Sequence, residues 1–414
     1  MLQNTYQGQF ERFFEPNMAR YLDILRQMVS INSFTTRPEG INLLGKLTMD
    51  VFSQLGFIAE SVPTANPLYG QHLFLTKLGS NGSKSPTIGM VSHLDTVYPP
   101  DDERRNNFSW RIEGDRVYGP GTIDIKGGTL MIYMILEFLQ SSAPEIFEET
   151  NWMILMNAAE ETLEPDFGDL CRKKLPVNAL ACLVFEGGRQ QKNQFSLVTS
   201  RKGMATFRVD VEGKAAHAGS AHKKGANAIV QLAHTVSRIS ELTDYNDGIT
   251  FNVGAIDGGT VSNRVPHEAF ASGEMRAFSP EVLEQGISHL LALQDDVQVY
   301  SLNGSYRCDV SVRILNRWRP WPSNEGSKRL LSFWQEAATA LDFEVTGAKR
   351  GGLSDGNLLW DHVPTIDGLG PAGGNAHCSE RSLDGSKDQE YVRISSFVPK
   401  ASLNSLAILK LLGV

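Results

Sequence analysis

The sequence has few of the features that mark secreted and membrane proteins. Its 414 residues include only four cysteines, which are scattered and form no CxxC pair. Disulfide-rich secreted domains use many more, so a reduced compartment, the cytoplasm, is expected. No basic start followed by an apolar stretch opens the chain, which argues against a signal peptide. The longest apolar run, 130–139, is half the roughly 20 residues that a membrane span needs.

The sequence also lacks an excess of positive charge. Asp and Glu number 47 against 39 Lys and Arg, which gives a net charge of −8. This mild acidic excess gives no sign of a basic surface that would bind nucleic acid or an anionic membrane. Hydrophobic residues make up 41% and charged residues 21%, a composition that argues against disorder. The length suggests two or three globular domains.

Hydrophobic periodicity predicts an α/β domain at the two ends of the chain. Continuous apolar strands that alternate with helices indicate a mostly parallel sheet covered by helices on both faces. Buried strands are predicted at 87–92, 152–156, 180–185 and 364–366, and helices at 18–31, 41–55, 127–140, 325–341 and 389–412.

The pattern changes near residue 201. Phe207, Val209 and Val211 alternate with charged residues, which is the period of a half-exposed strand. The predicted order from there is β-α-β-β-α-β, that of a ferredoxin-like α+β domain. Its strands are expected near 207–211, 249–256, 267–278 and 306–314, and its helices at 229–239 and 280–293. We therefore expect residues 201–315 to be a domain inserted into a larger one, formed by 1–200 and 316–414.

Polar clusters follow the predicted strands. In open α/β sheets ligands bind beyond the carboxyl ends of the strands, so chain segments far apart in sequence would meet there. The clusters are Ser92-His93-Leu94-Asp95, Gly119 to Asp124, Asn157 to Glu161, and Glu186-Gly187-Gly188, with His377 after the glycine-rich loop 368–375 as a further candidate.

Two imidazoles with several carboxylates and no thiolate suit a borderline divalent metal such as Zn²⁺. Three carboxylate ligands would offset most of the charge of two such ions, which fits a two-metal site with ions about 3.5–4 Å apart. Asp95 either binds metal or accepts the second N–H of His93 and fixes its tautomer. Adjacent Glu160 and Glu161 would diverge, one toward metal and the other toward the reacting water.

Each cluster alone is weak. A single His-x-Asp is usually structural, a Glu-Glu pair is usually solvated surface, and Gly187-Gly188 could be only a turn. Charged carboxylates directly after buried strands are harder to dismiss, because burying an unpaired charge is costly. Their joint occurrence is what favours a metal site.

The motifs occur in the order seen in a known family. They are SHLDTVYP, GPGTIDIKGG, AAEE, FEGG, HAG, SNRVP, GEMR and GGNAHCSE, and they cover nearly the whole chain. In this arrangement the sequence resembles the M20 metallopeptidases, and most of all their glutamate carboxypeptidase branch. The family also includes acetylornithine deacetylase and aminoacylases. The resemblance implies that the inserted domain is a lid or dimerisation domain, and hence a homodimer.

The resemblance also implies roles for single residues. Asp124 would bridge two metal ions, with His93 and Glu186 completing one site and Glu161 and His377 the other. Zn²⁺ is the first expectation, with Co²⁺ or Mn²⁺ as alternatives. Glu160 would be the general base, and Asp95 would orient His93.

Five further residues resemble parts of the family's substrate site. Arg276 corresponds to the residue that grips the substrate carboxylate, and Asn263 to a lid residue near the substrate. His217 resembles a histidine that reaches the partner subunit's active site and steadies the oxyanion. Gly351 and Gly352 resemble a backbone loop that lines the pocket.

The chain departs from the family pattern in two places. TLEPDFGDL follows Glu161 in place of a small Gly/Ser-rich turn, and extra residues lie between His377 and Glu390. Cys378 directly follows a proposed ligand and is expected to be a buried neighbour.

The expected activity is hydrolysis of an amide or peptide bond next to a free carboxylate, on a small peptide. One rival is an N-acyl-amino-acid deacylase of the acetylornithine deacetylase type, which would use the same metals. Another is a non-catalytic relative that binds peptides. The presence of all five proposed ligands together with a spare base, Glu160, argues against the latter.

Overall fold

The chain divides into two units, and most of the second is inserted into the first. The computed structural model describes residues 3–162, 164 and 166–414. Unit 1 comprises the chain up to Thr199 together with Ser323–Lys349 and Ser354–Val414. Unit 2 comprises Ser200–Pro322 and the short segment Arg350–Leu353, so it contains Gly351 and Gly352.

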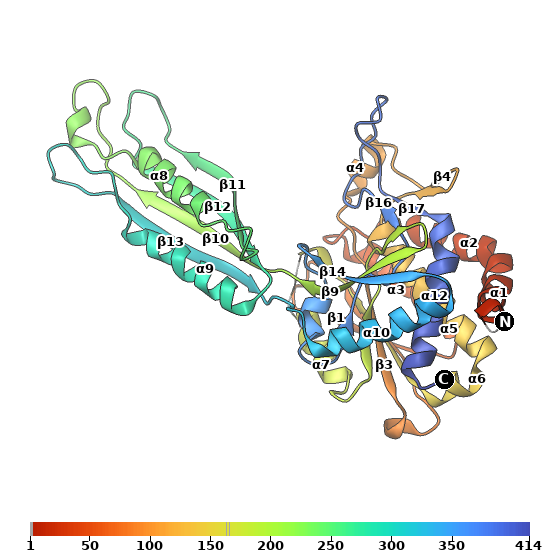
Figure 1. Cartoon of the computed structure of the whole chain (residues 1–414). Helices are drawn as coiled ribbons and strands as arrows, with labels where there is room; N and C mark the ends of the chain where they lie inside the picture. The colour runs from red at the N-terminus through yellow and green to blue at the C-terminus, as the bar shows by residue number, and fades with distance from the viewer. Residues whose placement is uncertain (1–2, 163, 165) are drawn as a thin grey trace. The chain divides into compact units, whose positions relative to one another are not determined.

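Unit 1 is built on a six-stranded sheet in the order β1-β2-β6-β3-β7-β15 (Figure 1). Its strands are β1 (Ile58–Pro63), β2 (Gln71–Lys77), β6 (Asn151–Asn157), β3 (Thr87–His93), β7 (Ala181–Val184) and β15 (Thr365–Ile366). The pairs β6–β3, β3–β7 and β7–β15 are parallel, which confirms the predicted mostly parallel α/β sheet. The antiparallel edge of β1 and β2 was not predicted, because β1 is largely exposed and has no buried apolar run.

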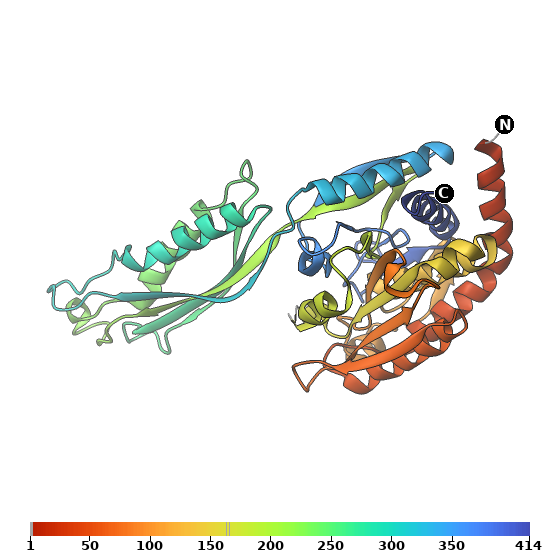
Figure 2. The same ribbon diagram turned by 90° about the horizontal axis from the view of Figure 1, so that it is seen from below.

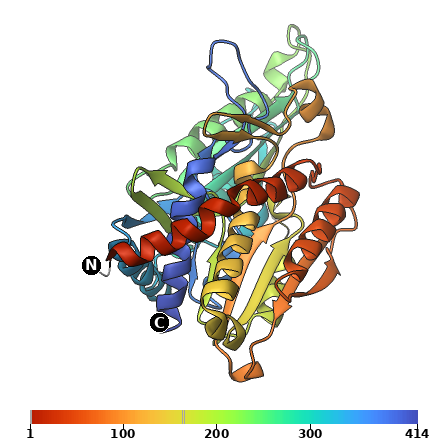
Figure 3. The same cartoon turned by 90° about the vertical axis from the view of Figure 1, so that its right-hand side faces the viewer.

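Helices cover both faces of this sheet. Ile88 and Met90 of β3 belong to a core that includes the wholly apolar middle of α5, whereas Val91 belongs to a second core with α7. Figure 3 looks onto the first face, where α3 (red-orange) and α5 (yellow) lie across the strands. The first core contains α1 (Gln3–Phe14), α2 (Met18–Val29), α3 (Pro38–Ser53), α5 (Gly127–Ser142), α10 (Glu325–Ala340) and α12 (Phe397–Leu411); the second contains α7 (Asp166–Lys174) and α11 (Gly356–Leu359).

Smaller elements complete unit 1. A four-stranded sheet has the order β16-β17-β5-β4, and a three-stranded sheet has the order β14-β9-β8. Their bounds, with two short helices, are β4 (Arg111–Glu113), β5 (Arg116–Tyr118), β8 (Arg189–Gln191), β9 (Gln194–Arg201), β14 (Glu344–Arg350), β16 (Gly373–Gly374), β17 (Tyr391–Arg393), α4 (Pro100–Arg105) and α6 (Pro144–Glu149).

The predicted start of the last helix at residue 389 is wrong. Tyr391–Arg393 instead form β17, which pairs with β5, and α12 begins only at Phe397. The side chain of Glu390 is buried and accepts hydrogen bonds from the backbone near Asp124. These pairings hold residues 390–393 outside the helix.

Unit 2 has the predicted β-α-β-β-α-β order. Its antiparallel sheet, ordered β11-β12-β10-β13, carries both helices on one face, as Figure 2 shows. The elements are β10 (Gly203–Glu212), α8 (Ala228–Glu241), β11 (Thr250–Gly258), β12 (Glu268–Ala277), α9 (Pro280–Ala292) and β13 (Asp309–Trp318). The predicted ferredoxin-like α+β class is therefore confirmed. In the described part of the chain, no helix has the length and apolar character needed to cross a membrane.

Candidate metal centre

The candidate metal ligands all lie in unit 1, and three of them lie at the ends of neighbouring strands. His93 ends β3, Glu160 and Glu161 follow β6, and Glu186 follows β7. Asp124 lies in the turn before α5, and this turn can approach the sheet closely because a Cβ on Gly128 would lie 2.1 Å from the carbonyl oxygen of Phe185. The loop after β16 supplies His377.

The structure brings five of these side chains into two groups that share one carboxylate. His93, Asp124 and Glu186 form one group, and Asp124, Glu161 and His377 form the other. Nε2 of His93 lies 3.1 Å from Asp124 Oδ1, and Nε2 of His377 lies 3.3 Å from Asp124 Oδ2. The two oxygens of Asp124 thus face different groups, which is the geometry of a bridging carboxylate.

The remaining distances complete each group. Nε2 of His93 lies 3.8 Å from Glu186 Oε1, and Nε2 of His377 lies 3.3 Å from Glu161 Oε2. Within each group the candidate ligand atoms lie within 4.8 Å of one another. One imidazole nitrogen with two carboxylate oxygens is a donor set that suits a borderline divalent cation.

Asp95 organises this centre without lying in either group. The Nδ1 of His93 is 3.0 Å from the Asp95 carbonyl oxygen and 3.3 Å from its carboxylate Oδ1. Both partners are acceptors, so Nδ1 carries a proton, which leaves Nε2, on the side of Asp124, as the nitrogen that would bind a metal ion. Of the two roles open to Asp95 in the sequence, the geometry favours the orientation of His93.

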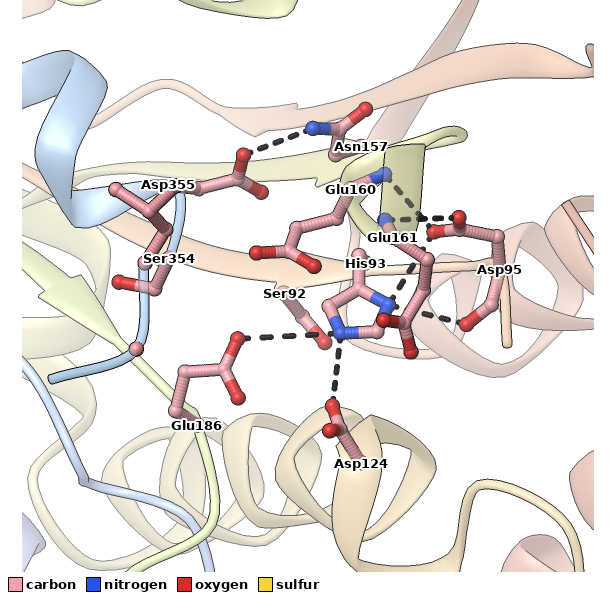
Figure 4. A network of polar contacts seen from close by, with 12 residues as sticks. Ser92, His93, Asp95, Asp124, Asn157, Glu160, Glu161, Glu186, Ser354 and Asp355 are labelled. Carbon is pink, nitrogen blue, oxygen red and sulfur yellow. Dashed lines mark hydrogen bonds and ion pairs between the residues drawn. The ribbon is translucent and has the colours of Figure 1, made fainter. Parts of the chain in front are cut away.

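The same carboxylate also holds the turn that carries Glu160 and Glu161. The backbone N–H of Glu160 donates to Asp95 Oδ1 at 3.1 Å, and that of Glu161 donates to Oδ2 at 3.2 Å. Thr35 Oγ1 adds a hydrogen bond to Oδ2 at 2.8 Å. Figure 4 shows Asp95 bonded at once to His93 and to this turn. Local sequence patterns did not predict this second function of Asp95.

Glu160 lies beside the two groups and belongs to neither. Its side chain is buried, and Figure 4 shows its carboxylate on the same side of His93 as that of Glu186. Burial raises the pKa of Glu160 well above its ordinary value; the charge of His93 opposes this, and the carboxylates of Glu186 and Asp355 reinforce it. A raised pKa means that the carboxylate binds a proton more readily than an exposed one, which suits a group that accepts a proton and then releases it.

The electrostatics of the centre favour a bound cation. Hydrogen bonds to Asp124 and Glu161 raise the pKa of His377 to about 11. Burial disfavours the charge on Asp124, but the hydrogen bonds from His377 and His93 outweigh it and hold the pKa below its usual range. Glu161 Oε1 is buried without a hydrogen-bond partner among the described residues. A group of side chains with this much negative charge and an unpaired acceptor fits a metal ion, which competes with protons for such ligands.

Several side chains that contact the centre were missed in the sequence. Glu390 is fully buried, and its carboxylate accepts from the N–H groups of Ile123 at 2.8 Å and Asp124 at 3.1 Å and from Tyr98 Oη at 2.5 Å. Burial raises the pKa of Glu390 to about 7. A lone acidic residue in a predicted helix gave no signal, since its partners lie in distant parts of the chain.

Two other expectations concern neighbours of the ligands. Cys378 is half-buried, not buried as expected, and its thiol lies 3.6 Å from the carbonyl oxygen of Glu380. The unusual segment after Glu161 leads into α7, which begins at Asp166; its residues Leu163 and Pro165 lie outside the described part of the chain.

The remaining candidate residues lie in unit 2. Arg276 on β12 donates through Nε and Nη2 to Glu274 at 2.7 and 3.0 Å, and through Nη1 to the carbonyl oxygen of Gly351 at 3.1 Å. Arg201 holds the adjoining carbonyl of Gly352 at 3.0 Å. The structure thus joins three of the predicted substrate residues in one contact network.

His217 and Asn263 lie on two neighbouring segments away from this network. The N–H of Ala218 donates to the Asn263 carbonyl oxygen at 2.9 Å, and both residues are exposed. Nδ1 of His217 accepts from the amides of Gly219 at 3.1 Å and Ser220 at 3.2 Å. The neutral ring therefore carries its proton on Nε2, which is left as a donor.

Comparisons with known proteins agree with this fold. A family model described as a peptidase dimerisation domain matches residues 199–296. Carboxypeptidase G2 of Pseudomonas sp. (strain RS-16) is 30% identical over 378 residues, which are 90% of this chain and 84% of that protein.

Solved structures show the same fold at lower identity. The M20 family metallo-carboxypeptidase Sso-CP2 of Sulfolobus solfataricus superposes with a TM-score of 0.68 at 18% identity, over 94% of this chain and 98% of that one. The YXEP protein of Bacillus subtilis, a dinuclear metal-binding peptidase of the M20 family, gives 0.66 at 13% identity, over 97% and 100%.

The two-unit α/β fold with a dimerisation domain and a candidate metal centre defines a class of metal-dependent peptidase. Identity at this level across most of both chains is decisive: the protein belongs to the M20 family of metallopeptidases. The resemblance inferred from the motifs is confirmed.

Proposed function

We propose that this protein is a two-metal hydrolase that cleaves an amide or peptide bond next to a free carboxylate, as a glutamate carboxypeptidase does. The observation that carries the proposal is the position of Asp124, whose two oxygens face two separate groups of ligands. Such a bridging carboxylate would serve no purpose at a single-ion site.

We assign the ligands as inferred from the motifs. His93, Asp124 and Glu186 hold one ion, and Asp124, Glu161 and His377 hold the other, with Zn²⁺ as the first choice and Co²⁺ or Mn²⁺ as alternatives. When bound, such a pair polarises the substrate carbonyl and lowers the pKa of bound water toward about 7. Asp95 keeps His93 in the tautomer that can bind.

Glu160 is the proposed general base. It takes a proton from the attacking water and delivers it to the leaving nitrogen, so the same carboxyl group acts first as base and then as acid. Its burial supports this role, because the raised pKa brings the proton affinity of the carboxylate closer to that of the groups with which it exchanges.

Arg276 is the proposed anchor for the substrate carboxylate. Glu274 engages its Nε–Nη2 edge and the Gly351 carbonyl engages Nη1, which holds the guanidinium in one orientation. Nη1 and Nη2 each carry a second N–H. The Nη1–Nη2 edge of the guanidinium matches the spacing of the two oxygens of a carboxylate. The loop of Gly351 and Gly352 lies beside Arg276, and we assign Asn263, which lies beyond the far end of β12, to substrate recognition as well.

We further propose a homodimer formed through unit 2, in which His217 donates from Nε2 to the oxyanion in the partner subunit's site. The edge strand β11 presents an exposed Ile256, and the start of α8 presents exposed Ile229 and Val230. Exposed apolar residues on an edge strand favour pairing with another chain. The molar mass in solution of wild type and of Ile256→Asp, measured by light scattering, tests the dimer. Leu302→Asp is a matched exposed control.

We place the protein in the cytoplasm, which the four free cysteines of the structure support. The decisive experiment measures metal content and hydrolysis together. The purified protein is assayed with peptides that end in glutamate and with N-acetyl-amino acids, before and after chelation. We expect two metal equivalents per chain and chelator-sensitive cleavage of the peptides. Preference for the acetyl compounds would instead indicate the deacylase, and inactivity with two ions bound would indicate a binding protein.

A further inference from the structure

The turn that carries Glu160 and Glu161 has an unusual set of backbone partners. The four successive N–H groups from Ala158 to Glu161 each donate to a side chain. Asp95 receives the last two, as described above. Asn157 Oδ1 receives that of Ala159 at 3.0 Å, and His72 Nδ1 receives that of Ala158 at 3.1 Å. Every donor at the start of this turn is therefore fixed by a side chain.

The surroundings of His72 fix its ring so that Nδ1 accepts the hydrogen bond from Ala158. It lies on β2, is fully buried, and its ring lies against Phe167 with the centroids 5.2 Å apart. Nε2 lies 3.3 Å from Asp166 Oδ2, an acceptor, so the ring proton resides on Nε2 and Nδ1 is free to accept. Asp166 is itself anchored, because it accepts the N–H of Ala65 at 2.6 Å. Burial lowers the pKa of His72, which keeps the ring neutral.

Asn157 is the second side chain that holds the turn, and its own position is also fixed by a hydrogen bond. Its Nδ2 donates to Asp355 Oδ1 at 2.8 Å, as Figure 4 shows, so its amide cannot turn over without losing both contacts. Asp355 is buried on the segment that leads into α11. The turn is thus tied to β2 through His72, to α7 through Asp166, and to the α11 segment through Asn157.

The direction of the turn matters because its two glutamates have different tasks. Glu160 and Glu161 are adjacent, and one carboxylate has to face the reacting water while the other joins the group of Asp124 and His377. A small rotation of the turn moves both carboxylates at once. Displacements of about 1 Å at a catalytic group can cost on the order of 100-fold in rate.

We propose that His72, with Asn157, is a positioning residue that sets the directions of Glu160 and Glu161 by holding the amides at the start of their turn. This inference rests on the proposed function, since it concerns the same base and the same metal ligand. It extends that function to two elements, β2 and α7, that carry no part of the metal centre.

Two substitutions at His72 separate hydrogen bonding from packing. In His72→Asn the Oδ1 atom stands where Nδ1 stood and can still accept from Ala158, but much of the ring volume is lost. In His72→Phe the ring volume remains and the acceptor is lost. A positioning role predicts that Phe is the worse substitution, whereas a packing role predicts that Asn is worse, because it leaves a cavity.

The measured quantities are kcat, KM, and the affinity for Zn²⁺ in competition with a chelator. We expect His72→Phe to lose about 10- to 100-fold in kcat or in affinity for the second Zn²⁺ ion, with KM within about threefold of wild type. His72→Asn should recover most of that loss although its melting temperature is the lower of the two. Equal losses, or a greater loss in His72→Asn, would overturn the proposal.

A second pair covers the case in which His72→Phe does not fold. Asp166→Ala removes the acceptor that fixes the His72 tautomer, and Asp166→Asn retains an acceptor oxygen, both at a site that is partly exposed. Asp166→Ala should lose kcat or Zn²⁺ affinity as His72→Phe does, but to a smaller extent. A difference of less than about twofold in that quantity between Asp166→Ala and Asp166→Asn would count against the proposal. If wild type binds two Zn²⁺ ions but cleaves none of the substrates tested, the proposed function fails, and the affinity measurement still decides the role of His72.

Discussion

The two units of this protein present their polar residues in opposite ways. In unit 1 the proposed site is largely buried, and its parts are held by backbone amides, as Asp95 and Glu390 show. In unit 2 His217 and Asn263 are exposed, and Arg276 is held by a neighbour on its own strand. The contrast suits the proposed division of work, in which unit 1 holds the metal ligands and the base, and unit 2 offers side chains to the substrate, with His217 for the oxyanion.

The strongest test of the contrast removes the shared carboxylate. Asp124→Asn should prevent binding of both metal ions and abolish hydrolysis, because each of its oxygens faces a different ligand group. Glu161→Gln should cost one metal equivalent, since Glu161 belongs to one group alone. Metal analysis by mass spectrometry after dialysis distinguishes the two. Loss of a single equivalent in Asp124→Asn would refute the bridging arrangement.

Replacement of the proposed base should leave metal binding intact. Glu160→Gln should lower kcat by about 10²- to 10⁴-fold with two metal ions still bound, because the side chain lies outside both ligand groups. Stopped assays with metal analysis on the same sample measure both. Glu145→Gln, on the exposed surface of α6, is the matched control. A near-normal rate in Glu160→Gln would show that another group moves the proton.

A substitution in unit 2 should instead affect recognition. Arg276→Lys keeps the charge but loses the planar fork, so KM for peptides that end in glutamate should rise by about 10-fold, with a smaller change in kcat. Arg313→Lys, on the same sheet and paired with Asp210, should leave both constants unchanged. Steady-state kinetics are sufficient. If Arg276→Lys lowers kcat and spares KM, Arg276 acts in the chemical step and not in recognition.

The smallest expected effect concerns stability against pH in the chelated protein. The pKa of His377 is raised to about 11, so its protonated form is favoured by folding. The stability it contributes is fully present below the unfolded pKa of about 6.5 and is lost as the pH rises toward 11. Melting temperatures of chelated wild type and His377→Asn should therefore converge at high pH. If the melting temperatures of the two proteins instead change in parallel with pH, this would contradict the ion pairs of His377 with Asp124 and Glu161.

The sequence predicted most of the elements, and the meeting of the polar clusters at one edge of the sheet, because both follow from local rules. Buried strands such as β3 and β6 are short apolar runs, and a polar cluster directly after such a strand lies at one edge of a parallel sheet. The motifs then identified the family. The start of α12 was missed because β17 and Glu390 are fixed by contacts with β5 and the Asp124 turn, which no local pattern records.

The orientation of the site depends on contacts that join distant parts of the chain. The sequence offers Asp95 two roles, and only its distances to His93, Glu160 and Glu161 single out one. His72 has no motif, yet it meets the amide of Ala158 across 86 residues of chain. Residue type and spacing specify which groups are available; the direction of each lone pair depends on which backbone amides folding brings to it.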